Sequence, residues 1–92
     1  MSFTTELMDA VKAAQAIGSD YRLAQVLGVT RATVSNWRTG RKFPTQTTVY
    51  ELARLAGMDA GEALLGVMMD SRGPDLGANL RAAWVEAEPA SG

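Results

Sequence analysis

Residues 23–40 read LAQVLGVTRATVSNWRTG and predict two short helices joined by a tight turn. Leu23, Ala24 and Leu27 lie together on one face of the first helix, because positions i, i+1 and i+4 are neighbours on a helix surface. Gly28 ends that helix, since the residue after a helix C-terminus commonly takes the left-handed conformation that glycine adopts at little cost. The segment therefore contains its own stop signal between two helical stretches.

The second of these helices is predicted to begin after Thr30, whose hydroxyl can accept a hydrogen bond from a backbone N–H of the first turn. Val34 and Trp37 lie three residues apart and are predicted to face the core together. Gly40 ends the helix. Ala24 is small, as required where two helices cross steeply beside a short turn. These features predict two short helices that cross closely beside a tight turn.

The outward face of the second helix carries side chains suited to the major groove of DNA. They are small or hydrogen-bonding, include one cation and no acid, and belong to Arg31, Ala32, Thr33, Ser35 and Asn36. Arginine can pair with guanine through two hydrogen bonds and asparagine with adenine, while a methyl group can contact thymine. Short hydroxyl side chains can reach phosphates. This face is a candidate surface for reading a DNA sequence.

The segment resembles the helix-turn-helix repressors of the Cro/CI type (XRE-like), a family of phages and bacteria. The run V-S-x-W-x-x-G-x-x-x-P is a common form of that family's recognition helix and following loop. The resemblance implies an all-α, lambda-repressor-like DNA-binding domain of five helices over residues 1–72, with the motif at residues 20–40. The matching residues are Leu23, Ala24, Gly28, Val29, Thr30, Val34, Ser35, Trp37, Gly40, Arg41, Lys42 and Pro44.

Carried over by position, the resemblance implies contacts to base edges from Arg31, Ala32 and Asn36. For Arg22 and Arg38, an ion pair within the protein is an equal alternative to a contact with DNA. The resemblance implies contacts to the DNA backbone from Thr30, Thr33, Arg41 and Lys42. Further candidates for such contacts are Ser19, Arg22, Ser35 and Arg38.

The chain departs from the family pattern at the start of the first motif helix. Many relatives have a glutamine there, whose side chain hydrogen-bonds to a DNA phosphate. In this chain the segment is Ser19-Asp20-Tyr21-Arg22. Because the carboxylate of Asp20 would repel a phosphate, Ser19, Tyr21 or Arg22 takes that role, or the contact is absent.

The charge of the chain is concentrated in the motif. The net charge is −1 over 92 residues. Residues 21–42 nevertheless hold five cations and no acid, whereas the flanking residues 1–20 and 43–92 carry net charges of −2 and −4. A molecule with this distribution turns its basic side toward DNA.

The composition argues against other classes of function. The chain has no cysteine and no histidine, which removes the thiolate ligands of metals, disulfides and the commonest general base. No glycine-rich phosphate loop followed by lysine is present. We therefore expect no enzyme, no cofactor, no metal and no small-molecule substrate. No apolar run approaches membrane-spanning length and the first residues do not form a signal peptide, so we expect a cytoplasmic protein. The resemblance implies that its host is a bacterial or phage-infected cell.

Further helices are predicted on both sides of the motif. Thr4 or Thr5 can cap a first helix that Gly18 ends, and Ser19 caps the next. The expected buried stripe of the first helix consists of Leu7, Met8, Val11, Ala14 and Ile17. Beyond the motif, Thr45 can cap a fourth helix, although Thr48 with Glu51 also fits a capping box.

Gly57 is predicted to end the fourth helix, and Asp59 with Glu62 to start a fifth. We expect Ala63, Leu64, Val67 and Met68 to form its apolar stripe. Met68 and Met69 are expected to fill gaps in the core rather than form an adaptable binding surface. Gly66 makes this helix less regular.

Residues 73–92 are predicted to form a C-terminal helix and a flexible tail. Its apolar stripe includes Leu76, Leu80 and Trp84, which are candidate dimerisation residues. The segment can fold back on its own domain, pair with a second protomer or stay loose. The large apolar surface of Trp84 favours docking or dimerisation.

Taken together, these features predict a sequence-specific transcriptional regulator. The expected form is a homodimeric Cro/CI-like repressor that binds a palindromic double-stranded DNA operator through residues 30–39. Its two recognition helices should lie about 34 Å apart, one turn of DNA. The alternative is an antitoxin or adaptor that uses the same fold mainly for protein–protein interaction.

Overall fold

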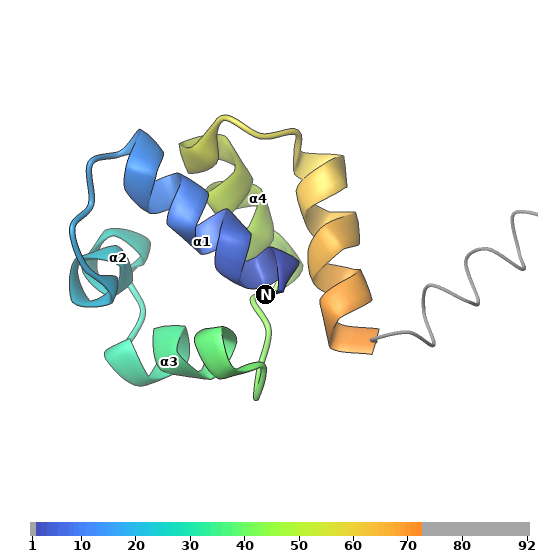
Figure 1. The fold of residues 1–92 in the computed structure, drawn as a ribbon, viewed down its shortest axis with the longest axis horizontal. Coiled ribbons are helices and arrows are strands. Elements are labelled where there is room, and N and C mark those ends of the chain that lie inside the picture. Colours follow the sequence, from blue (N-terminus) through green and yellow to red (C-terminus); the bar gives the residue numbers. More distant parts are fainter. Residues whose placement is uncertain (1, 73–92) are drawn as a thin grey trace, which may run out of the picture.

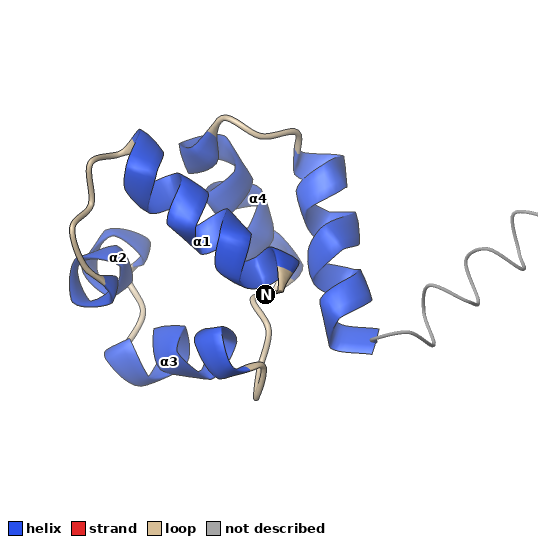
Figure 2. Cartoon of the chain, in the orientation of Figure 1, coloured by secondary structure: helices blue, strands red, loops and turns tan. Residues whose placement is uncertain are grey.

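The computed structural model of the protein describes residues 2–72, and these residues fold into helices without a strand. The helices are α1 (Phe3–Ala14), α2 (Asp20–Leu27), α3 (Arg31–Thr39), α4 (Gln46–Ala56) and a fifth helix over residues 60–72 (Figure 1, Figure 2). The prediction of an all-α domain of five helices is confirmed. The predicted C-terminal helix, with Leu76, Leu80 and Trp84, lies outside the described residues.

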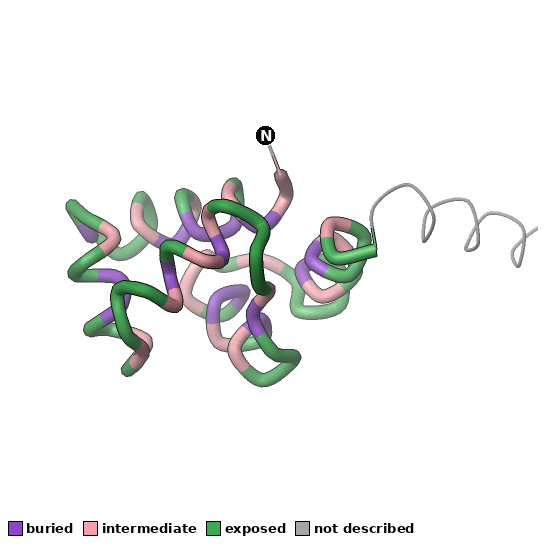
Figure 3. Tube along the Cα trace, turned by 90° about the horizontal axis from the view of Figure 1, so that it is seen from below, coloured by how far each residue is buried: buried purple, intermediate pink, exposed green. Residues whose placement is uncertain are grey.

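Helix α1 occupies the middle of the fold. It packs against α4 along one side and against α3 along another, while α2 packs mainly on α3 (Figure 1). Buried residues recur along every helix and alternate with exposed ones, as expected for helices that each turn one face toward a shared core (Figure 3). The buried side chains of this core include Leu7, Met8, Val11, Leu23, Val34, Trp37, Val49 and Leu52.

The boundaries of α2, α3 and α4 follow the local signals of the sequence. The hydroxyls of Ser19, Thr30 and Thr45 each accept a hydrogen bond from the backbone N–H three residues later, at 3.1, 3.1 and 3.4 Å. Each helix then ends at a glycine in the left-handed conformation. These glycines are Gly28, Gly40 and Gly57, with φ of 71°, 76° and 71°. The predicted caps and stops of these three helices are confirmed.

The predicted start of α1 is wrong, because Ser2 caps this helix through a hydrogen bond from the backbone N–H of Thr5. Thr4 is fully buried instead. Its backbone N–H and its hydroxyl both donate to Asp70 Oδ2 of the fifth helix at 2.6 Å, and the N–H of Phe3 donates to Oδ1 at 3.3 Å. The carboxylate of Asp70 thus satisfies the open N–H groups of Phe3 and Thr4 at the start of α1.

The predicted end of α1 is also wrong. The helix ends at Ala14, and Ala16 rather than Gly18 takes the left-handed conformation, with φ of 54°. The N–H of Ile17 then bonds to the carbonyl of Lys12 at 2.8 Å, so the chain reverses before the glycine is reached. Ile17 is buried as predicted, but Ala14 is exposed.

The expectation that Met68 and Met69 of the fifth helix fill gaps in the core is wrong. Ala63 and Val67 are buried as predicted, whereas Met68 and Met69 are 41% and 42% exposed. Gly66 has a packing role, because a Cβ at this position would overlap the ring of Phe3. None of the helices in residues 2–72 has the length and hydropathy needed to cross a membrane.

Candidate nucleic-acid interface

Helices α2 and α3 form the predicted two-helix motif. The side chain of Ala24 is only 2% exposed, which agrees with its expected place where the two helices cross. After α2 ends, the N–H of Val29 donates to the carbonyl of Ala24 at 3.0 Å and closes the turn at Gly28. This tight turn and the buried Leu23 fix the direction in which α3 leaves the motif.

Helix α3 has one buried face and one exposed face. Val34 and Trp37 are 1% and 4% exposed, which confirms their predicted place in the core. Arg31, Ala32 and Ser35 are exposed on the opposite side. The candidates for base contact therefore include two exposed residues near the start of α3, Arg31 and Ala32. The third candidate, Asn36, is only half-buried and lies one turn further along.

The hydroxyl groups around the motif are exposed at helix starts. Thr30 Oγ1 accepts from the N–H of Thr33, and the two threonine hydroxyls share a hydrogen bond at 2.8 Å. Ser19 is exposed while it caps α2. One hydroxyl of the threonine pair and the hydroxyl of Ser19 therefore keep an O–H that can donate to a phosphate oxygen.

The loop after α3 presents two further cations. The N–H groups of Arg41 and Lys42 both donate to the backbone carbonyl of Asn36, at 3.0 and 3.3 Å, so this loop folds back on the end of α3. Both side chains are exposed. Phe43 packs against the core and anchors the other end of the loop. The two cations are therefore held beside the recognition helix.

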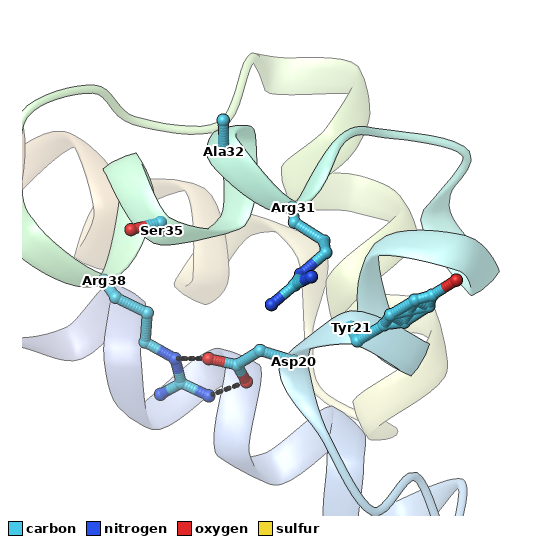
Figure 4. Close-up of a pocket in the computed structure, with 6 residues that line it drawn as sticks. All are labelled: Asp20, Tyr21, Arg31, Ala32, Ser35 and Arg38. Atoms are coloured by element: carbon cyan, nitrogen blue, oxygen red, sulfur yellow. Dashed lines mark hydrogen bonds and ion pairs between the residues drawn. The ribbon is translucent and has the colours of Figure 1, made fainter.

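A concavity of about 500 Å³ opens between the start of α2 and the outward side of α3 (Figure 4). Within it, the guanidinium carbon of Arg31 lies over the ring of Tyr21, 5.3 Å from the ring centroid. The concavity is lined by Asp20, Tyr21, Arg31, Ala32, Ser35 and Arg38.

Arg38 is engaged within the protein. Its Nε and Nη2 donate to the two carboxylate oxygens of Asp20 at 3.0 and 2.8 Å (Figure 4). Its Nη1 lies 2.8 Å from Asp9 Oδ1. The side chain of Arg38 is only 20% exposed. The structure thus shows the ion pair that the sequence left open for Arg38. This arginine ties α3 to α1 and α2.

Lys12 of α1 completes this group with an ion pair to Asp20 Oδ1 at 3.2 Å. The hydrogen bond from Arg38 holds the pKa of Asp20 below its ordinary value against the opposing effect of burial, and Lys12 lowers it further. The hydrogen bond to Asp20 likewise raises the pKa of Arg38 above its ordinary value. The charge of Asp20, which the sequence set against a phosphate contact, is therefore balanced by two cations.

The other cations of the motif are not neutralised by a carboxylate in the described residues and can interact with DNA phosphates. Arg22 donates from Nη1 to the neutral side-chain oxygen of Gln25 at 3.2 Å. Within residues 2–72, no ion pair involves Arg22, Arg31, Arg41 or Lys42. The sequence could not reveal that Asp9 and Lys12 support the site, because they belong to α1 and reach it only through the tertiary fold.

Comparison with known proteins agrees with this geometry. A family model described as helix-turn-helix matches residues 10–62, which is more than half of the chain and includes all of α2, α3 and α4. No curated protein and no solved structure matches the chain.

Proposed function

The chain belongs to the helix-turn-helix family of the Cro/CI (XRE) type, a family of DNA-binding regulators, and we propose that it is a homodimeric transcriptional repressor that binds a palindromic operator. Occupation of the operator would block access to a promoter in a bacterial or phage-infected cell.

The observation that carries this proposal is the exposed face of α3. Arg31, Ala32 and Ser35 lie on this face, while Val34 and Trp37 fix the opposite face in the core. A helix held in this way presents its first turn to the major groove, where an arginine can read guanine. We assign base contacts to Arg31 and Ala32, with Asn36 at the far edge.

The surroundings of α3 supply groups for phosphates. We assign backbone contacts to exposed or half-buried hydroxyls and to cations whose charge is not balanced by a carboxylate in the described residues. These residues are Ser19, Arg22, Thr30, Thr33, Ser35, Arg41 and Lys42. Arg38 acts from inside the protein, because its ion pairs with Asp9 and Asp20 fix the orientation of α3.

The proposed dimer is supported by an apolar surface on the fifth helix. Leu65, Met68 and Met69 are spaced to lie on one face of this helix, and each is more than 40% exposed. Apolar side chains gathered in this way commonly mark an interface. We propose that this face and residues 73–92, with Leu76, Leu80 and Trp84, join two protomers so that their α3 helices lie about 34 Å apart.

The test is selection of DNA from a random pool by the full chain, with the mass of the free and DNA-bound protein measured in solution. The proposal predicts an enriched inverted repeat bound by two copies, with an affinity that falls steeply with salt. A failure to enrich any sequence, together with a stable complex with another polypeptide, would instead favour an antitoxin or adaptor.

A further inference from the structure

We propose that Tyr21 is a specificity-determining positioning residue, whose ring holds the guanidinium of Arg31 in the orientation that reads a base. This inference rests on the proposed function, because it concerns the same α3 surface. It adds a residue of α2 to the groups that decide which base pair the protein prefers.

The geometry joins the first turns of two helices. Tyr21 is the second residue of α2 and Arg31 the first residue of α3, and the guanidinium carbon of Arg31 lies 5.3 Å from the centre of the tyrosine ring (Figure 4). A separation within about 6 Å gives an attractive cation–π interaction. The Tyr21 side chain is 48% exposed, so this ring serves no major role in the core.

Stacking on a ring is compatible with reading a base. The π system of tyrosine attracts the flat face of a guanidinium, while the N–H donors point outward in the plane of that group. Those donors form the two hydrogen bonds with O6 and N7 of guanine. A ring beneath Arg31 can therefore restrict its rotamers without occupying its donors.

A contact that limits the rotamers of Arg31 would help it bind DNA. Its side chain is long and exposed, and ordering it on DNA loses rotamer entropy. A cation at the first position of a helix also gains nothing from the helix dipole. A ring that orders Arg31 before DNA arrives reduces the entropy lost on binding.

The ion pairs of Asp20 keep its carboxylate from binding Arg31. Asp20 lines the same concavity as Arg31 and would be a stronger partner than a neutral ring. Its carboxylate oxygens are instead bound by Arg38 and Lys12. With Asp20 so engaged, Arg31 contacts the ring of Tyr21 and keeps its charge for DNA.

The hydroxyl of Tyr21 offers a different role, since the sequence also makes it a candidate for a phosphate contact. The two roles respond differently to substitution. Tyr21→Phe keeps the ring and removes the hydroxyl, whereas Tyr21→Leu keeps apolar bulk and removes the ring. A phosphate contact acts on all DNA sequences alike, whereas positioning of Arg31 acts on a single base pair.

The experiment measures binding of the full-length wild type, Tyr21→Phe, Tyr21→Leu, Arg31→Ala and the Tyr21→Leu/Arg31→Ala double variant. The DNA probes are the selected operator, the operator altered at the base pair whose preference Arg31→Ala abolishes, and a scrambled duplex. We expect Tyr21→Leu to lower discrimination at that base pair about two- to fivefold, with binding to the scrambled duplex unchanged. Tyr21→Phe should retain discrimination, and Tyr21→Leu should have no further effect when Arg31 is already alanine.

Equal weakening on every duplex by Tyr21→Phe would overturn the inference and assign the hydroxyl to a phosphate. If Tyr21→Leu distinguishes the operator from the altered operator as well as the wild type does, this inference is wrong, but the proposed function is unaffected. If the wild type selects no operator, both the inference and the proposed function are wrong. In the free protein, NMR should show a ring-current shift of the Arg31 Nε–H that Tyr21→Phe keeps and Tyr21→Leu loses, and the absence of this shift would also overturn the inference.

Discussion

Asp20 is an acid at the edge of the proposed DNA interface, yet its charge is balanced inside the protein. Arg38 and Lys12 bind its carboxylate from α3 and α1. The sequence identified Asp20 as a departure from the family pattern but not the partners that neutralise it, because Lys12 and Arg38 meet it only through the fold. The exposure of Arg31, Ala32 and Ser35 was predictable from local spacing, whereas this network and the partial burial of Thr33 and Asn36 were not.

Asp20→Asn should make the stability of the protein less sensitive to acid. The pKa of Asp20 is lowered in the folded state, so its ion pairs stabilise the fold above about pH 4 and this stabilisation is lost as the pH falls through the folded-state pKa. Since the side chain is 42% exposed, we expect about 1 kcal/mol or less near neutral pH. Urea unfolding across a pH series measures this difference.

Glu51→Gln is the matched control for this series. The pKa of Glu51 is also lowered, by Arg54, but this pair lies on the surface of α4, where solvent screens it. We expect a smaller pH-dependent difference for Glu51→Gln than for Asp20→Asn. A loss of stability in Asp20→Asn that is the same in acid as near neutral pH would contradict the assigned role of the carboxylate.

Arg22→Ala should weaken binding to all DNA sequences alike. Arg22 is exposed near the start of α2, and its partner in the protein is the neutral Gln25. Loss of one phosphate contact should lower the slope of log affinity against log salt by about 0.9. Arg54→Ala removes the same charge from α4 and should leave this slope nearly unchanged. A loss confined to the selected operator would show that Arg22 reads bases.

At the scale of the element, local signals decided most helix boundaries. Ser19, Thr30 and Thr45 cap their helices, and glycines end them, because capping and the left-handed conformation depend on neighbouring residues. Thr4 does not cap α1, because its hydroxyl donates to Asp70, 66 residues further along the chain, and Ser2 caps the helix instead. A partner so distant in sequence leaves no local pattern.

Gly66→Ala should destabilise the protein although alanine is the better helix former. The new methyl group would overlap the ring of half-buried Phe3, so the fifth helix and α1 would have to separate slightly. Overpacking commonly costs about 1–3 kcal/mol, which exceeds the gain of about 1 kcal/mol from helix propensity. Thermal or urea unfolding measures the sum of these effects.

The control is the same substitution in a Phe3→Leu background, where a smaller side chain faces position 66. Gly66→Ala should be neutral or stabilising there, and the two backgrounds together form a double-mutant cycle. If Gly66→Ala stabilises the protein even with Phe3 present, the close packing of α1 on the fifth helix is wrong.

At the scale of the whole molecule, net charge alone would have argued against DNA. The chain carries −1 overall, while residues 21–42 carry +5. The fold gathers these residues on α2, α3 and the following loop. The five-helix architecture followed from the sequence, but the exposure of Leu65, Met68 and Met69 did not, since helical spacing alone does not show which apolar residues find a partner in the core.

Met68→Glu should disrupt the proposed dimer without unfolding the domain. The side chain is 41% exposed, so a carboxylate there stays hydrated in the monomer but would be buried between two protomers. We expect a lower mass in solution and weaker binding to the palindromic operator, with binding to a single half-site retained. Tyr50→Glu places the same charge at an exposed aromatic residue of α4 and should preserve the dimer. A dimer unaffected by Met68→Glu would place the interface elsewhere.

The central claim is that the exposed face of α3 reads DNA, and a change of specificity tests it most directly. The measurement is selection from a random pool by wild type and by a folded Arg31→Gln variant. Arginine prefers guanine and glutamine prefers adenine, so the account predicts that one base pair in each half-site changes from guanine to adenine while the others are kept. Selection of the unchanged wild-type site by Arg31→Gln would contradict it.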